Sequence, residues 1–232
     1  MSTRLVKHQK LTKRQIKEDP LVTAAFRGTA LWERYGTRIL IGLGAVALAV
    51  LLAIFVSRTR AQSEERASGD LFRARMSLAQ RDYPTAIQML REIVDNAPGT
   101  RAARDAMGFL GDAYSDQGKP ADAVTWYRRH LGKAGRDPMV KAAALSGLAA
   151  ALEDRGDFQQ AAENYGELAK LAEWDPERAR ALLSQARCYG RAGQTQKAIE
   201  IYRQIGQMPN VDAPSRNSAE FGLGEMQATT PR

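Results

Sequence analysis

Two sets of charged residues share one spacing in different parts of the chain. One set is acidic and the other basic, with intervals of seven and then four residues: Asp105, Asp112 and Asp116, and Arg180, Arg187 and Arg191. In a helix these intervals bring the side chains to one face. Carboxylates and guanidinium groups on such faces can bind a partner segment of opposite charge. The alternative is a solvated helix face whose charges pair with their neighbours.

The residue types that usually carry catalysis are scarce. The chain has two histidines and one cysteine. His8 lies in a basic N-terminal segment, and His130 lies at a predicted helix end, where a histidine commonly interacts with the helix dipole. Cys188 is expected to be a small packed residue, and a single cysteine cannot form an internal disulfide. No HExxH, GxSxG, P-loop or CxxC pattern occurs. We therefore predict no enzymatic activity, no cofactor and no metal site.

Residues 39–56 form an uncharged apolar run, ILIGLGAVALAVLLAIFV. Eighteen helical residues rise about 27 Å, close to the thickness of the hydrocarbon core of a bilayer. A cleaved signal peptide has a short charged start and an apolar stretch of about 7 to 15 residues. Here 38 residues precede the run, and the residues after it, SRTR, make a poor cleavage site. The run is predicted to be a single transmembrane helix.

The charge of the chain is concentrated before this run. Residues 1–38 hold nine basic and three acidic residues, whereas the remaining 194 residues hold 25 basic and 23 acidic ones. The nearly neutral remainder argues against nucleic-acid binding, while the tail can contact anionic lipids of the bilayer. A basic tail favours a cytoplasmic N-terminus and a periplasmic C-terminal domain. Counting only twenty residues on each side gives three cations before and five after the run, so an inverted topology is the alternative.

Within the run, three alanines recur every four residues: Ala45, Ala49 and Ala53. Small residues on one helix face allow a second membrane helix to approach closely. We expect this face to pack against a membrane partner or a second copy. The alternative explanation is the alanine-rich composition of the chain.

A helical linker is predicted at 57–66, followed by a repeat of 37 to 38 residues that fills 67–227. Three positions recur in this register: Ala86, Ala123, Ala161 and Ala198; Gly118, Gly156 and Gly193, with Arg81 in the first unit; and Leu90, Tyr127, Tyr165 and Tyr202. One helix pair cannot bury its own apolar face, but stacked pairs can. The prediction is an all-α solenoid of about four helix-turn-helix repeats, with a capping helix and a disordered end at 228–232.

These units resemble the tetratricopeptide repeat family. The match is carried by Leu110-Gly111-x-x-Tyr114, followed by Gly118, Ala123 and Tyr127. The period is longer than the usual 34 residues, which leaves Sel1-like repeats as an alternative. The resemblance implies a protein-binding groove lined by the first helix of each pair. Glu153 and Asp154 occupy the corresponding end of the third unit, so such a groove would run from acidic to basic.

The layout as a whole resembles the bacterial ancillary subunits of the SecYEG translocon. The segment LWERYGTRILIGLGAVALAVLLAIFVSRTR is similar to that family's membrane junction, although the Lys-rich start KLTKRQIKEDPLVT departs from its shortest members. The resemblance implies an inner-membrane protein whose partners are translocon subunits, a periplasmic chaperone or unfolded client chains. A scaffold for envelope or cell-division machinery and a cytoplasm-facing adaptor are the alternatives. The sequence specifies neither the partner nor the oligomeric state.

Overall fold

The computed structural model describes residues 20–228, and every regular element among them is an α-helix. The helices are α2 (Pro20–Ala79), α3 (Tyr83–Asn96), α4 (Arg101–Asp116), α5 (Pro120–Lys133), α6 (Pro138–Arg155), α7 (Phe158–Leu171), α8 (Asp175–Arg191), α9 (Thr195–Gln207) and α10 (Ala213–Ala228). They belong to two compact units, Met1–Thr59 and Arg60–Arg232, and α2 contributes to both. Much of the predicted basic tail and the last four residues lie outside the described residues.

In the first unit, the apolar run lies inside α2, and its side chains from Leu40 to Val56 are exposed. Ile41, Leu51 and Phe55 are 68%, 64% and 66% exposed, respectively. The helix from Tyr35 reaches a mean hydropathy of 3.0 and is long and apolar enough to cross a membrane. Membrane anchors and signal sequences share this property of length and composition. Ala45, Ala49 and Ala53 are also exposed, and their packing against a second helix stays a prediction.

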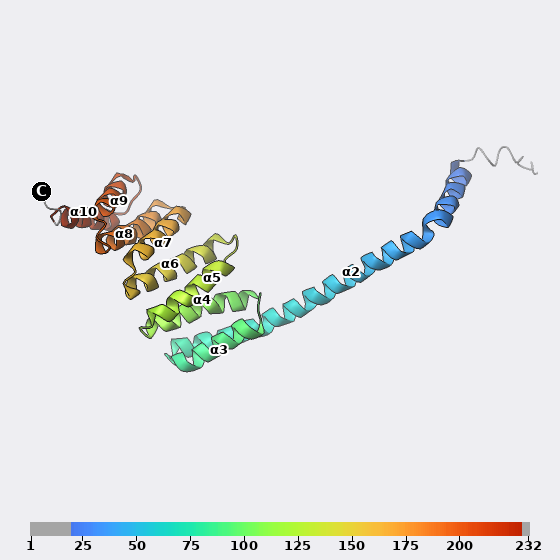
Figure 1. Cartoon of the computed structure of the whole chain (residues 1–232), viewed down its shortest axis with the longest axis horizontal. Coiled ribbons are helices and arrows are strands. Elements are labelled where there is room, and N and C mark those ends of the chain that lie inside the picture. Colours follow the sequence, from blue (N-terminus) through green and yellow to red (C-terminus); the bar gives the residue numbers. More distant parts are fainter. Residues whose placement is uncertain (1–19, 229–232) are drawn as a thin grey trace, which may run out of the picture. The chain divides into compact units, whose positions relative to one another are not determined.

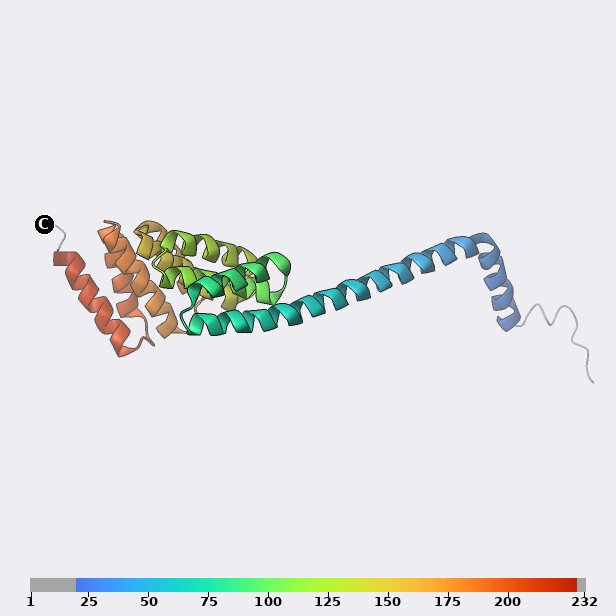
Figure 2. The same ribbon diagram turned by 90° about the horizontal axis from the view of Figure 1, so that it is seen from below.

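The second unit consists of consecutive antiparallel helix pairs (Figures 1 and 2). The end of α2 pairs with α3, and α4–α5, α6–α7 and α8–α9 follow, with α10 packed against α9 and α8. The predicted turn glycines Gly118, Gly156 and Gly193 have φ values of 66°, 90° and 74°. Arg81, which replaces glycine in the first unit, also has a positive φ of 61°. The left-handed conformation is therefore a property of the turn, and glycine adopts it at the lowest cost.

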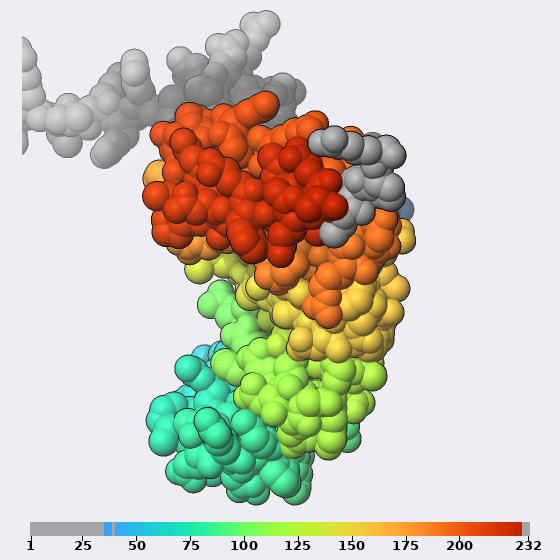
Figure 3. Space-filling view, turned by 90° about the vertical axis from the view of Figure 1, so that its left-hand side faces the viewer, coloured from blue at the N-terminus to red at the C-terminus, as the bar shows by residue number. Residues whose placement is uncertain are grey.

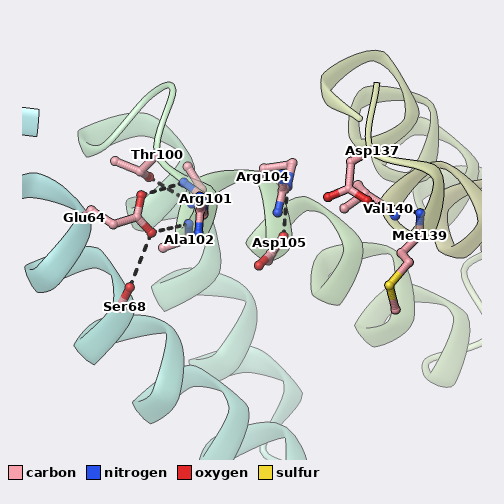
Figure 4. A network of polar contacts seen from close by, with 11 residues as sticks. Glu64, Ser68, Thr100, Arg101, Ala102, Arg104, Asp105, Asp137, Met139 and Val140 are labelled. Atoms are coloured by element: carbon pink, nitrogen blue, oxygen red, sulfur yellow. Dashed lines mark hydrogen bonds and ion pairs between the residues drawn. The ribbon is translucent and has the colours of Figure 1, made fainter. Parts of the chain in front are cut away.

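The starts of α3, α4 and α6 are fixed by polar caps, from Asp82, Thr100 and Asp137. Thr100 Oγ1 accepts a hydrogen bond from the Ala103 amide at 3.0 Å, at the N-terminus of α4. Figure 4 shows Glu64 of α2 reaching the same helix end, where its carboxylate accepts from the amides of Arg101 at 2.6 Å and Ala102 at 3.1 Å. The first turn of a helix leaves these amides without intrahelical partners, and a carboxylate there also interacts favourably with the helix dipole.

The core is built from small residues at helix crossings and large apolar residues beside them. The repeated alanines Ala86, Ala123, Ala161 and Ala198 are completely buried. The largest side chains with almost no exposure are Leu90, Leu110, Leu152 and Ile205. Alanines at the crossings let neighbouring helices approach closely, so that stacked pairs bury one continuous core.

The array curves with the first helix of each pair on its inner side. Helix α4 contacts α6, and α8 contacts α10, whereas contacts of this extent do not join α6 to α8, α5 to α7 or α7 to α9 among the described residues. From α4 to α10, two of the three neighbouring pairs of first helices are thus in direct contact, which favours the first helices as the inner side. Figure 3 shows the outline of this unit indented between the green residues of α4 and α5 and the orange residues of α8 and α9.

Candidate functional site

Two neighbouring pockets lie along the first helices of the repeat unit. The upstream pocket, of about 400 Å³, is lined by residues of α2, α4, α5 and α6: Leu71, Arg75, Asp105, Gly108, Phe109, Asp112, Tyr127, His130, Met139, Val140 and Ala143. The downstream pocket, of about 840 Å³, lies mainly between α6 and α8, with α7 behind it. Met139 and Ala143 of α6 line both pockets, so the two are adjacent and are together called the cleft.

The upstream pocket combines apolar walls with two carboxylates. Phe109 forms part of the wall, and the Arg75 guanidinium carbon lies 5.2 Å from the centre of its ring. Asp105 and Asp112, predicted to share a face of α4, both line this pocket. Asp105 Oδ1 accepts from Arg104 Nε at 3.0 Å, and 42% of the Asp105 side chain remains exposed.

Asp112 is hydrogen-bonded to Tyr127, an aromatic residue of α5. The Tyr127 hydroxyl donates a hydrogen bond to Asp112 Oδ1 at 2.5 Å. Desolvation by the surrounding protein raises the pKa of Asp112, and the charge of Asp116 adds to this effect, against the hydrogen bond from Tyr127. A desolvated carboxylate gains more than a hydrated one when a cation approaches it.

His130 is the polar residue that least fits its surroundings. Its side chain is 7% exposed, and neither ring nitrogen has a hydrogen-bond partner. The ring packs against Gly108, where an added Cβ would lie 2.9 Å from it. Burial lowers the pKa of His130, as does Arg104, whereas the charges of Asp105 and Asp112 act in the opposite direction. The neutral imidazole is therefore the form that this environment favours.

Comparison of the four repeat units shows that His130 occupies a position that is apolar in the other units. The equivalent positions of the other units carry Ile93, Leu168 and Ile205, all apolar. A histidine replaces an aliphatic residue only in the second unit. His130 lies in the last turn of α5, and its interaction with the helix dipole stays a prediction; the structure also places it at the wall of the upstream pocket.

The downstream pocket presents exposed apolar side chains above a floor that includes small residues. Met139 is 82% exposed and Trp174 is 69% exposed. Ala142 and Ser146 of α6 contribute to the floor. Arg180 lines the same pocket, and its guanidinium lies 3.9 Å from a carboxylate oxygen of Asp212.

The remaining predicted charges lie outside both pockets. Glu153 accepts hydrogen bonds from Arg187 at 2.9 Å and from Arg191 at 3.3 Å. Burial opposes ionisation of Glu153, but the hydrogen bond and charge of Arg187, with help from Arg191, lower its pKa. Asp116 accepts from the Tyr83 hydroxyl at 3.3 Å. Asp154 follows Glu153 on α6. The basic end of the predicted groove is thus partly paired with Glu153 of the third unit, and Asp116 at the acidic end is bound by Tyr83.

Reactive and metal-binding side chains contribute little to this region. Burial and the neighbouring Glu153 raise the pKa of the buried Cys188 thiol to about 12, so it stays protonated at neutral pH. Within residues 20–228, no three His, Cys, Asp or Glu side chains are arranged to hold a metal ion. What the arrangement offers is an apolar cleft with charged groups along it.

Two tetratricopeptide repeat models match residues 73–138 and 140–205, which together make up more than half of the chain. The chain is a tetratricopeptide repeat protein. Both matches fall within the repeat unit, and the boundary between them coincides with the start of α6. No curated protein sequence significantly matches this tetratricopeptide repeat protein.

Solved structures share its fold. Nearly identical TPR-like repeats from Podosopora anserina have 20% identity and a TM-score of 0.57, covering 71% of this chain and 87% of theirs. A tetratricopeptide repeat protein from Parabacteroides merdae has 18% identity and a TM-score of 0.58, covering 72% and 61%. BtubC from P. vanneervenii has 15% identity and a TM-score of 0.53, covering 73% and 81%. As a tetratricopeptide repeat protein, the chain provides a scaffold for protein–protein interaction.

Proposed function

We propose that this protein is a non-catalytic, membrane-anchored interaction module that binds protein segments in the cleft formed by the two pockets. The observation that carries this proposal is the adjacency of the two pockets, which share Met139 and Ala143 and expose apolar side chains such as Met139 and Trp174. Exposed apolar side chains on the concave side of a repeat array are unfavourable in water and are stabilised when a partner covers them. Asp105, Asp112 and Arg180 supply charges along the same cleft.

The apolar part of α2 supports the membrane anchor. A helix whose apolar side chains point outward in every direction needs an apolar environment around it, and the hydrocarbon core of a bilayer provides one. We place the basic tail in the cytoplasm and the repeat unit in the periplasm of a bacterial inner-membrane protein, because basic residues are retained on the cytoplasmic side. The alanine face of Ala45, Ala49 and Ala53 is then available to another membrane helix.

The more specific role that we propose is assistance to newly translocated chains at the SecYEG translocon. Its support is the resemblance of residues 31–60 to the membrane junction of ancillary translocon subunits, together with a cleft suited to extended chains. The partners would be translocon subunits, a periplasmic chaperone or the unfolded clients themselves. A scaffold for envelope or cell-division machinery would use the same cleft for different partners.

In-cell photo-crosslinking tests the binding role. A photoreactive phenylalanine analogue is placed at Met139 or Trp174 in the cleft, and at Phe221 on α10 as a control of matched exposure, 69% against 69% for Trp174. We expect both cleft positions to capture a common set of proteins that the control does not. Crosslinks that are absent, or identical at all three positions, would contradict binding in the cleft.

The identity of the captured proteins tests the translocon role, and reporter fusions test the orientation in the membrane. Translocon subunits or nascent secretory chains among the crosslinked proteins would support the translocon role, whereas division or envelope proteins would favour the scaffold. Reporter fusions after Ser57 and after Arg232 should be active only with a periplasmic reporter. Activity with a cytoplasmic reporter at both sites would instead establish the inverted, cytoplasm-facing adaptor.

A further inference from the structure

We propose that the upstream pocket binds a basic side chain, lysine or arginine, from an extended partner segment whose neighbouring side chains are apolar. This inference rests on the proposed function, because it names the chemistry of the segment that the cleft receives. It concerns Asp105, Asp112 and His130, which the pocket brings together from α4 and α5.

The charges of the pocket favour a cation. Its lining includes two carboxylates, Asp105 and Asp112, and one guanidinium, Arg75, which is stacked near Phe109. Arg104 already pairs with Asp105, so Asp112 is the carboxylate that a partner's cation would mainly serve. A carboxylate offers about four acceptor positions, and each of these two accepts one hydrogen bond, Asp105 from Arg104 Nε and Asp112 from the Tyr127 hydroxyl. Acceptor capacity therefore remains on both groups. Desolvation is the main cause of the raised pKa of Asp112, with the charge of Asp116 adding to it, and the residue is still exposed enough for a cation to reach it.

His130 provides a second and independent observation. Its side chain is more than nine-tenths buried at the pocket wall, and both ring nitrogens lack partners. A buried polar group without a partner costs free energy, and the aliphatic residue found at Ile93, Leu168 and Ile205 would avoid that cost. Retention of a histidine at this one position is explained if the imidazole, after a small side-chain adjustment, contributes an acceptor to a bound cation.

The apolar walls of the pocket determine which side chains are favoured beside the basic residue of the bound segment. Leu71, Phe109 and Val140 line the pocket beside the charged groups, so the methylenes of a lysine or arginine stem would lie along an apolar surface. Met139 then leads into the larger downstream pocket, where neighbouring apolar side chains would be buried. An acidic segment would bring like charges toward Asp105 and Asp112, which is unfavourable in a partly desolvated site.

Peptide binding to the full chain in lipid nanodiscs tests the proposal. The probe is a fluorescein-labelled peptide, Ser-Ala-Leu-Lys-Phe-Ala-Ser, followed by fluorescence anisotropy. Matched peptides carry norleucine, which keeps the methylene stem without the charge, or glutamate in place of lysine. We expect the lysine peptide to bind about tenfold more tightly than the norleucine peptide, in the range for a charged hydrogen bond, and the glutamate peptide to bind most weakly.

Variants then assign the preference to the pocket. The pair Asp105→Asn and Asp112→Asn keeps side-chain shape and should abolish the lysine preference. The control pair Asp95→Asn and Glu200→Gln removes the same net charge from exposed positions on α3 and α9 and should preserve it. His130→Leu should reduce the preference while raising the melting temperature, because it removes the unpaired buried nitrogens.

Equal binding of the lysine and norleucine peptides, or equal losses in the pocket and control pairs, would overturn the basic-side-chain site. Failure of every peptide to bind at millimolar concentration would overturn it as well. An unchanged lysine preference in His130→Leu would remove that residue from the site. None of these results would affect crosslinking from Met139 and Trp174, so the binding role of the cleft is judged separately.

Discussion

Tyr127 of α5 packs closely against a glycine on each of two neighbouring helices. Its ring faces Gly111 of α4 on one side and Gly147 of α6 on the other. A Cβ added at Gly147 would lie 2.5 Å from Tyr127 Cζ, and one added at Gly111 would lie 2.6 Å from Cε1. Non-bonded carbon atoms are optimally separated by about 3.5 to 4.0 Å. The ring cannot move away from one helix without approaching the other.

The substitution Gly147→Ala should therefore destabilise the repeat unit even though alanine is the better helix former. Overpacking a well-filled site costs about 1 to 3 kcal/mol, and the upper part of this range applies because the ring is rigid and confined on both sides. The gain in helix propensity offsets about 1 kcal/mol. The net loss is about 1 to 2 kcal/mol, equivalent to a fall in melting temperature of about 2 to 8 °C for a domain of this size.

Thermal unfolding of the full chain, followed by the fluorescence of the buried Trp126, measures this effect. The matched control is Gly224→Ala in α10, where an added Cβ meets nothing within 4 Å. That variant should gain up to about 1 kcal/mol from propensity alone. In a Tyr127→Leu background the cost of Gly147→Ala should largely disappear. A Gly147→Ala protein as stable as the control, or a cost that persists without the tyrosine, would refute the confinement argument.

Three other substitutions test the helix cap at Glu64, the ion pair of Glu153 and the burial of neutral His130. Glu64→Gln should lower stability by about 0.5 to 1 kcal/mol and speed hydrogen exchange at the Arg101 amide, because the charged cap of α4 is lost; unchanged exchange would contradict the cap. The pKa of Glu153 is lower in the folded protein than in the unfolded chain, so Glu153 stabilises the fold above the unfolded pKa, and this stabilisation is lost as the pH falls through the folded pKa. The difference in melting temperature between wild type and Glu153→Gln should therefore narrow on acidification. A constant difference would argue against the ion pair with Arg187. Because the folded pKa of His130 is lowered, the unfolded chain binds more protons, and stability should fall as pH drops below about 6.5, by at most about 1.4 kcal/mol per pH unit. His130→Leu should flatten that dependence in thermal scans, and an identical slope would disprove neutral burial.

The fold was predictable because its determinants recur along the chain. Alanine at a helix crossing and glycine at a left-handed turn are selected by local geometry, and four units repeat them in one register. Even the exception, Arg81, adopts the positive φ that its position in the repeat requires. The apolar run was equally visible, since eighteen uncharged residues stand out from composition alone.

The candidate site was only partly predictable, because its properties depend on contacts between units. The spacing of Asp105 and Asp112 predicted a shared helix face, and both residues do line one pocket. Helical spacing alone could not show that Glu153 would pair with Arg187, because these residues are 34 positions apart and belong to different units. Nor could it show that Tyr127 and His130 of a second helix would form part of the same pocket.

The sequence by itself determined the helical repeats, their turns and an apolar helix before them, because each follows from local residue preferences repeated at a fixed interval. Only the tertiary structure decided which charges remain available and which are paired. Stacking brings side chains from separate units within hydrogen-bond distance, and burial at those contacts changes their ionisation. For the same reason, an unremarkable histidine in the sequence became an unpaired buried group beside two carboxylates.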